Sequence, residues 1–196
     1  MKVSSLISRC KKGRPKAQRQ MVEMYSDDLF NICCRYVQDQ SFAKDCLQES
    51  WIQIFWNLDK YKEEGKWESW IKMVTINKCK EMLRKEGKWK VSAIDHIDEC
   101  LDSNVEDLII EEENVNMFLD KLPQRYRMVV NLYLVEGYNH KEIAAFLEIT
   151  ESSSRSLLSR ALKLLKDAFK EPDQSESIKN TQVKRIRNSI YKKAII

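Results

Sequence analysis

Apolar residues recur every three or four positions through much of the first half of the chain, which predicts amphipathic helices. The pattern predicts a helix over 17–37, a second over 41–58 and a third over 67–86, the last two separated by a short charged loop at 60–66. Helices of this length can together bury one small core. Residues 1–90 are therefore expected to form a first helical domain.

The third of these helices is expected to have an apolar inward face and a basic outward face. The pattern places three residues inward and four basic residues outward: Trp70, Met73 and Val74 against Lys72, Lys80, Arg84 and Lys85.

The second half begins with a different pattern. Residues 91–116 are acidic and weakly periodic, which indicates a linker. A second helical domain is expected over 117–170, starting at the Leu122-Pro123 pair. Residues 171–196 are polar and basic and are expected to be a frayed tail. The fold class predicted is all-α, with two small helical domains joined by an acidic linker.

Inside the second domain the residues at helix ends are specific. Asn139 followed by Glu142 forms a capping box, in which each side chain bonds the backbone of the other residue. That helix ends near Leu147, and Thr150 can cap a last helix that reaches Phe169. Both helices bear apolar residues at the positions a three-helix core requires: Ile143, Ala144, Leu147, Ile149, Leu158 and Leu162.

Composition supports the helical reading. The chain of 196 residues has only 4 Gly and 3 Pro, and 33% of its residues are charged. Its net charge of +4 is uninformative, but the charge is unevenly distributed. Residues 1–20 hold seven basic and no acidic side chains, whereas residues 95–120 hold ten acidic side chains and no Lys or Arg. Such blocks indicate separate surfaces with separate partners.

Targeting and cysteine patterns point to the cytoplasm. We see no signal peptide and no apolar run long enough for a membrane span, so no membrane insertion is expected. The six cysteines contain no C-x-x-C pair, which favours reduced, buried thiols over zinc ligands or disulfides.

Residues 143–166 have the spacing of a helix-turn-helix. A short helix, a turn at Glu148-Ile149-Thr150 and a longer helix follow one another. The outward face of the longer helix presents short polar or basic residues, which can reach base edges and phosphates in a major groove: Ser152, Arg155, Ser156, Ser159 and Lys163. The alternative is an ordinary helical hairpin with a solvated basic face.

The first domain suggests two further surfaces. All five Trp lie between residues 51 and 89 among ten basic residues, which suits stacking on single-stranded nucleic acid, although core packing beside a solvated face explains it equally well. The second helix carries one polar stripe that is either a protein-docking face or a solvated one: Asp45, Gln48, Glu49, Ile52 and Gln53.

Five segments, taken in order, resemble the sigma-70 family of RNA polymerase sigma factors, in its extracytoplasmic-function group. Residues 6–13 are similar to the opening of these proteins, and 43–55 to their polymerase-docking helix. Residues 67–85 resemble the regions that open and read the promoter −10 element. Residues 119–144 and 153–161 resemble the helix-turn-helix region that reads the −35 element. The resemblance covers residues 4–170.

The resemblance implies a role for each surface. The stripe Asp45, Gln48, Glu49, Ile52 and Gln53 would bind core polymerase. The −10 element would be read by Tyr61, Lys66, Trp67, Asn77, Lys80, Arg84 and Lys85. The −35 element would be read by His140, Lys141, Ser152, Ser153, Arg155, Ser156, Ser159, Arg160 and Lys163. The expected partners are core polymerase through its β′ clamp and β flap, promoter DNA and an anti-sigma factor. The acidic linker would thread the polymerase's RNA path, although solvated disorder explains its charge equally well.

Three positions depart from the family's pattern. Glu148 stands at a turn position where glycine is usual and where a positive φ is expected. Leu157 stands where a polar or basic residue is usual, which indicates fewer DNA contacts on that side. Glu81 and Met82 replace a frequent Asp-aromatic pair, which indicates an unusual −10 specificity.

Two other classes of function match the sequence less well. A stand-alone helix-turn-helix transcription regulator would use residues 122–170 without joining polymerase. An enzyme is not expected, because the two histidines, His96 and His140, belong to no catalytic constellation and no Gly-rich phosphate loop occurs. No cofactor or metal is expected.

Overall fold

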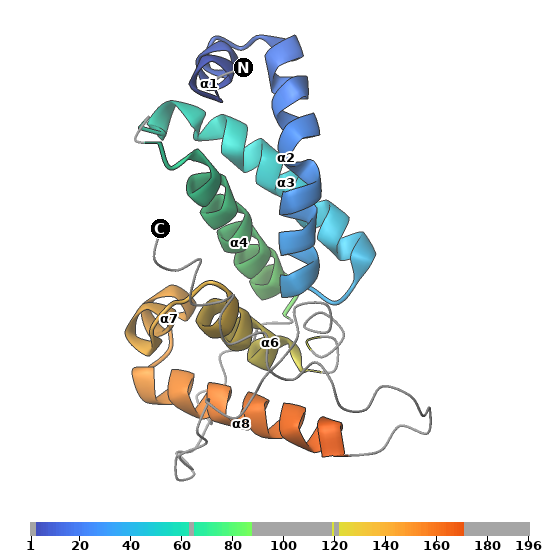
Figure 1. Cartoon of the computed structure of the whole chain (residues 1–196), viewed down its shortest axis with the longest axis vertical. Coiled ribbons are helices and arrows are strands. Elements are labelled where there is room, and N and C mark those ends of the chain that lie inside the picture. Colours follow the sequence, from blue (N-terminus) through green and yellow to red (C-terminus); the bar gives the residue numbers. More distant parts are fainter. Residues whose placement is uncertain (1–2, 63–64, 88–118, 120–121, 171–196) are drawn as a thin grey trace, which may run out of the picture. The chain divides into compact units, whose positions relative to one another are not determined.

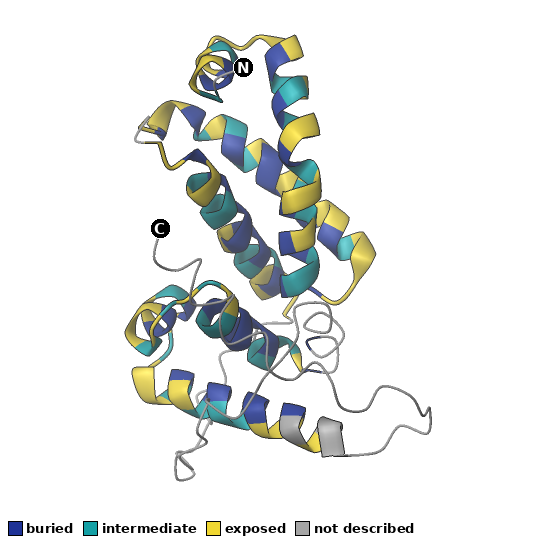
Figure 2. Cartoon of the chain, in the orientation of Figure 1, coloured by how far each residue is buried: buried dark blue, intermediate teal, exposed yellow. Residues whose placement is uncertain are grey.

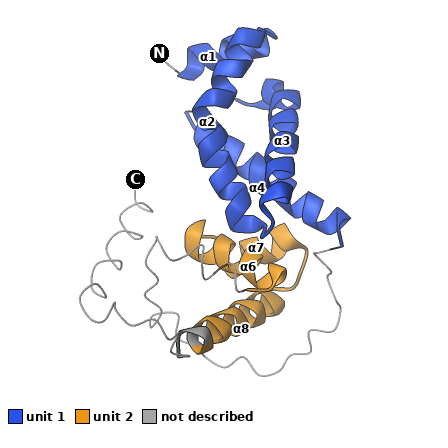
Figure 3. Cartoon of the chain, turned by 90° about the vertical axis from the view of Figure 1, so that its right-hand side faces the viewer, with its two compact units in different colours: residues 1–90 blue, residues 91–196 orange. Residues whose placement is uncertain are grey.

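The computed structural model describes residues 3–62, 65–87, 119 and 122–170. All regular elements in these residues are helical, which confirms the all-α fold class (Figure 1). The chain divides into two compact units, residues 1–90 and 91–196 (Figure 3). The acidic linker and the C-terminal tail predicted from the sequence lie outside the described residues. None of the described helices combines the length and the hydropathy that crossing a membrane requires.

The described residues of unit 1 form four α-helices and a short 3₁₀ turn. These are α1 (Val3–Lys11), α2 (Pro15–Tyr36), α3 (Gln40–Trp56), η1 (Leu58–Lys60) and α4 (Trp67–Lys85). Asp39 caps α3 by accepting a bond of 2.6 Å from the Phe42 amide. Helices α2, α3 and α4 pack on one another, and their buried faces form the core (Figure 2).

The sequence pattern does not predict α1. This helix buries Leu6, Ile7 and Cys10 and packs on α2. Its short apolar face is interleaved with basic residues, so the charge of the segment conceals the helical period.

The predicted inward face of α4 is wrong. Trp70, Met73 and Val74 are only partly buried, whereas Ile71, Thr75, Cys79 and Leu83 are buried at successive spacings of four. Thr75 tolerates burial because its hydroxyl donates a bond of 2.9 Å to the Ile71 carbonyl. The buried face is therefore rotated by about one residue from the face expected from apolar side chains alone.

Cysteines occupy the core of unit 1 as free thiols. Cys10, Cys33, Cys46 and Cys79 are buried and Cys34 is partly buried. Hydrogen bonding to Cys33 and Cys46, together with burial, raises the pKa of the Cys79 thiol. The Cys79 thiol therefore stays protonated and behaves as a small apolar core residue.

Unit 2 is built around a longer helix. Its elements are α6 (Gln124–Val130), a π-helical turn η3 (Asn131–Val135), α7 (His140–Leu147) and α8 (Glu151–Lys170). Both α6 and α7 pack on α8. Their buried apolar residues form the core of this unit: Met128, Val129, Leu132, Ile143, Leu147, Leu158, Ala161 and Leu162.

Candidate nucleic-acid and polymerase interfaces

The helix-turn-helix consists of α7, the turn at 148–150 and α8. The predicted capping box is confirmed: Asn139 accepts a bond of 3.0 Å from the Glu142 amide, and Glu142 accepts one of 2.8 Å from the Asn139 amide. Thr150 accepts a bond of 3.1 Å from the Ser153 amide, which confirms the predicted cap of α8. Glu148 adopts the left-handed conformation expected at the turn, with φ 60° and ψ 43°. The backbone at both helix starts is therefore satisfied locally.

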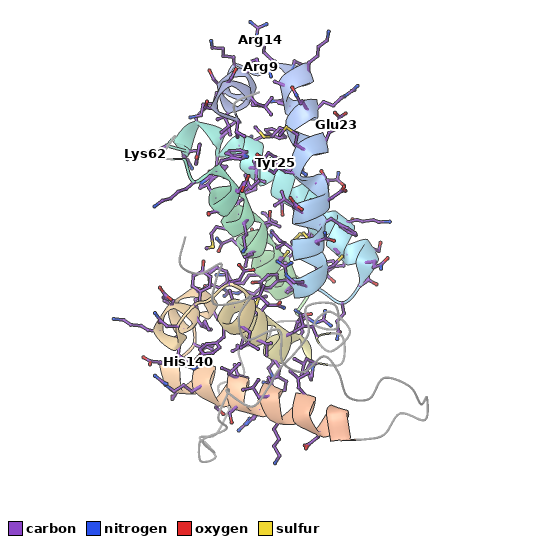
Figure 4. The ribbon with its side chains drawn as sticks, in the orientation of Figure 1. Arg9, Arg14, Glu23, Tyr25, Lys62 and His140 are labelled. Atoms are coloured by element: carbon purple, nitrogen blue, oxygen red, sulfur yellow. The ribbon has the colours of Figure 1, made fainter. Side chains whose placement is uncertain are left out.

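His140 connects the two helices of the motif. Its Nδ1 lies 3.0 Å from the Oγ of Ser154, a residue of α8 that is completely buried. Its ring stacks on Tyr133 at 4.9 Å between centroids and 25° between planes. The ring is half-buried at the first position of α7 (Figure 4). His140 was predicted to contact DNA, and here it also fixes α7 against α8.

Burial lowers the pKa of His140, and the nearby positive charge of Arg155 lowers it further, while Glu151 opposes this. The unfolded chain therefore takes up a proton on this residue more readily than the folded chain does. We expect the stability of unit 2 to fall as the pH decreases through about 6.5, the ordinary pKa of histidine. Thermal unfolding at pH 7.5 and 5.5 measures this effect. If His140→Gln has the same pH dependence as the wild type, another group causes it.

The residues of α8 that were predicted to bind DNA are exposed or partly exposed. Ser152, Arg155 and Lys163 are exposed, and Ser153, Ser156, Ser159 and Arg160 are partly exposed. Lys141 is exposed on α7. Arg155 forms an ion pair with Glu151 one turn earlier, and 54% of its side chain is exposed.

Leu157 does not lie on this face. It is 4% exposed and packs in the core of unit 2 with Leu158 and Ala161. Its side chain faces the core, so it takes no part in the outward face of α8.

The predicted docking stripe lies along one side of α3. Asp45, Gln48, Glu49 and Ile52 are exposed and Gln53 is partly exposed. The opposite side of α3 is buried, and there Ser50 donates a bond of 2.6 Å to the Cys46 carbonyl. The sequence reasoning missed Trp56, which follows Ile52 by one turn and is 83% exposed. Glu49, Ile52 and Trp56 are spaced by three and four residues, which places them on one side of a helix, and this spacing is the signal in the sequence that could have identified Trp56.

An aromatic cluster lies where the loop before α4 meets that helix. The rings of Tyr61 and Trp67 have centroids 5.3 Å apart, and Trp70 lies 5.2 Å from Tyr61 and 5.4 Å from Trp67. Tyr61 and Trp67 are only 5% and 4% exposed, so neither presents a ring face to DNA in this structure. Trp70 is partly exposed and has the available ring.

The remaining residues predicted to read the −10 element lie along α4 and just before it. Lys66, Asn77, Arg84 and Lys85 are exposed, and Lys80 is partly exposed. Asn77 donates a bond of 2.9 Å to the Met73 carbonyl. It also lines a small pocket between α3 and α4, together with Gln53 of the docking stripe.

Glu81 forms ion pairs with two lysines in the C-terminal part of α4. Its two carboxylate oxygens lie 2.8 Å from the Lys78 ammonium and 2.7 Å from that of Lys85. Hydrogen bonds from Lys78 and then Lys85 lower the pKa of Glu81. Glu81 therefore remains ionised and partly neutralises this stretch, where the family usually carries a different pair of residues.

No group of three His, Cys, Asp or Glu side chains suitable for holding a metal ion occurs in the part of the chain that the structure describes.

The chain has two helical units, and the second contains a helix-turn-helix, an arrangement typical of DNA-binding proteins. Comparison with known families agrees. Residues 21–88 match the family model "Sigma-70 region 2", and residues 112–165 match "Sigma-70, region 4". The chain belongs to the sigma-70 family of RNA polymerase sigma factors, in its extracytoplasmic-function group, which confirms the resemblance seen in the sequence.

Curated relatives carry the same family name. The chain is 27% identical over 154 residues to the ECF RNA polymerase sigma factor SigE of Mycolicibacterium smegmatis, covering 76% of this chain and 60% of that protein. It is 28% identical over 169 residues to the ECF RNA polymerase sigma-E factor of Salmonella typhimurium, covering 80% and 88%. It is 25% identical over 153 residues to SigM of Bacillus subtilis, covering 76% and 93%.

Among solved structures, the chain is similar to the sigma factor RpoE in complex with the anti-sigma factor NepR from Bartonella quintana. That match has a TM-score of 0.49 and 16% identity, and covers 79% of this chain and 98% of that chain.

Proposed function

We propose that this chain is an alternative sigma factor that binds core RNA polymerase, recognises promoter −35 and −10 elements and promotes opening of the DNA. The observation that carries the proposal is the occurrence, on one chain, of sigma-70 regions 2 and 4. A protein that only recognises duplex DNA has no need of region 2.

The second unit recognises the −35 element. Helix α8 enters the major groove with the exposed side chains of Ser152, Arg155 and Lys163. Lys141 at the start of α7 is placed for phosphate contact, which positions the protein but does not read sequence. This unit also contacts the β flap of polymerase.

The first unit joins polymerase and reads the −10 element. The exposed stripe on α3 binds the β′ clamp, with Asp45 and Glu49 supplying negative charge. The cationic side of α4, with Lys80 and Arg84, holds the DNA strand, and Trp70 offers a ring on which a base can stack. Tyr61 and Trp67 act by packing beneath Trp70 and fixing its position.

Strong promoter binding requires the DNA contacts of both units. A single module of this size buries only about 600–1,000 Å² on DNA and binds weakly alone. Joining two modules through polymerase makes the second contact intramolecular and raises its effective concentration. Specific promoter binding is therefore a property of the complex with polymerase.

The proposal includes an anti-sigma factor as a regulatory partner, a location in the bacterial cytoplasm and a non-catalytic role, all of which follow from membership of the family. The stand-alone regulator is not favoured, because such a protein has no use for an exposed docking face on a separate unit.

Strand opening provides a test of the −10 assignment. We expect Lys80→Ala to reduce promoter melting by polymerase more than it reduces formation of the closed complex, because the ammonium holds a strand that is exposed only after opening. Permanganate footprinting measures the melting. Lys80 is a cleaner target than Trp67, whose removal would leave a cavity in the core. Normal melting in Lys80→Ala, with Lys44→Ala as the matched control, would contradict the assignment.

Run-off transcription tests the function as a whole. Core polymerase is incubated with fragmented bacterial genomic DNA, with and without the purified chain. The proposal predicts discrete transcripts that require the chain. A stand-alone regulator would give none with core polymerase and would act only on a polymerase that already carries another sigma factor.

A further inference from the structure

Six basic residues gather where α1 turns into α2. Gly13 forms this turn and has a φ of +67°. The Gly13 amide donates a bond of 2.9 Å to the Cys10 carbonyl, and the Arg14 amide donates one of 3.3 Å to the Arg9 carbonyl. We call the exposed members of the group the basic corner: Lys11, Lys12, Arg14, Lys16 and Arg19. Arg9 is partly buried and bonds Gln20 at 3.3 Å. Figure 4 shows Arg9 and Arg14 at this end of unit 1.

The corner is bonded directly to the loop that precedes α4. The Lys11 ammonium donates a bond of 2.9 Å to the carbonyl of Tyr61, across 50 residues of sequence. The ring of Tyr61 packs on Trp67 and Trp70 of the aromatic cluster. Lys62, labelled in Figure 4, directly follows Tyr61 in the chain and is exposed. Lys11 therefore connects the corner, through Tyr61, to the cluster that contains the partly exposed Trp70.

Charge explains why the corner matters to this site. Residues 59–68, around the aromatic cluster, contain three lysines and four carboxylates, so they cannot by themselves attract a polyanion. Residues 9–19 contain six basic residues and no carboxylate. Glu23 is the first acidic residue of the chain and lies one helical turn beyond Arg19.

We propose that the basic corner binds phosphate groups of the promoter strand that the aromatic cluster and α4 hold. The proposal rests on the proposed function, because it assumes that unit 1 holds opened DNA. Cations beside a stacking ring are the usual combination for single-stranded DNA, in which the rings take bases and the cations take phosphates. We assign the corner to phosphate contacts alone, so its contribution is independent of sequence.

The test uses the full chain in complex with core polymerase. The dissociation constant for promoter DNA is measured over a series of KCl concentrations for the wild type and for a variant with Lys12→Gln, Arg14→Gln and Lys16→Gln. We expect the slope of log affinity against log salt to fall in magnitude by about 2 to 3, since each lost phosphate contact removes roughly 0.7 to 1. Promoter preference and polymerase binding should not change.

Two controls keep the result interpretable. A variant with Lys12→Arg, Arg14→Lys and Lys16→Arg keeps the charge and should keep the slope. Lys44→Gln removes an exposed charge of α3 outside the corner and should also leave the slope unchanged. An unchanged slope in the triple glutamine variant would overturn the proposal. So would a loss of polymerase binding in that variant, which would make the corner a protein-binding surface.

Failure of the proposed function would look different. In that case even the wild-type chain would bind no polymerase, and the salt slope of the free full chain on a single-stranded oligonucleotide would decide the role of the corner. A smaller slope in the triple glutamine variant would support it, and an equal slope would overturn it.

Discussion

Replacing Asp45 by Arg and Gln48 by Ala is expected to abolish binding to core RNA polymerase while leaving duplex DNA binding by the second unit unchanged. Both side chains are exposed on α3, and neither belongs to the core of unit 1. The Arg substitution reverses the charge at a surface that we assign to a cationic partner. Juxtaposed like charges cost several kcal/mol, which corresponds to an affinity loss on the order of 100-fold or more.

The measurement is the affinity of labelled chain for core polymerase, accompanied by a thermal unfolding curve. Because both positions are exposed, the variant should unfold at the same temperature as the wild type. Lys44→Ala, at a neighbouring exposed position of α3, is the matched control and should bind polymerase normally. Full affinity in the double variant would show that polymerase docks elsewhere.

The second large effect is expected at Arg155. Arg155→Ala should weaken recognition of the −35 element by about 1–3 kcal/mol, or roughly 10- to 100-fold, because a groove-facing arginine pairs with a base through two bonds. The residue is exposed on α8 and is held there by Glu151. DNA competes with Glu151 for the guanidinium group, so the effect should fall towards the lower end of this range.

Competition between promoter fragments, with and without the −35 element, measures this loss in the complex with polymerase. Lys163→Ala is expected to weaken both fragments of a matched pair equally if Lys163 contacts phosphate only. Unchanged promoter choice in Arg155→Ala would remove Arg155 from the reading face. The salt dependence of the affinity distinguishes the base contact assigned to Arg155 from the phosphate contact assigned to Lys163.

Local features of the fold were predictable because their causes are local. The capping box at Asn139, the cap at Thr150 and the positive φ at Glu148 each depend on a few adjacent residues, and the structure confirms all three. The helical periodicity of apolar residues in α2 and α3 could be recognised in the sequence because each helix buries one face. These features suffice to predict two helical units and the turn of the DNA-binding motif.

Features that depend on packing between helices were not predictable. Tyr61 and Trp67 were expected to contact DNA, but other aromatic rings bury them. The face of α4 was misjudged because a buried threonine satisfies its hydroxyl within its own helix. Leu157 was expected to reduce the DNA contacts on one side of α8, and packing within unit 2 places its side chain in the core.

The exposure of Trp56 also depends on packing between helices and was not predicted from the sequence. Its spacing from Ile52 indicates on which side of α3 it lies, but not whether a neighbouring element covers its ring, and 83% of the residue is exposed at the end of α3. Large exposed aromatic residues next to a polar stripe are common at the centres of protein interfaces. Its position, one turn from Ile52, agrees with the docking role assigned to this side of α3.

The central claim is that this chain becomes a subunit of RNA polymerase. The most direct test is gel filtration of the purified full chain mixed with bacterial core polymerase in equal amounts, followed by quantification of both proteins across the peak. The account predicts that the chain elutes with polymerase at a ratio of one to one. Elution of all the chain at its own smaller size, with no anti-sigma factor in the preparation, would contradict the account and favour a stand-alone regulator.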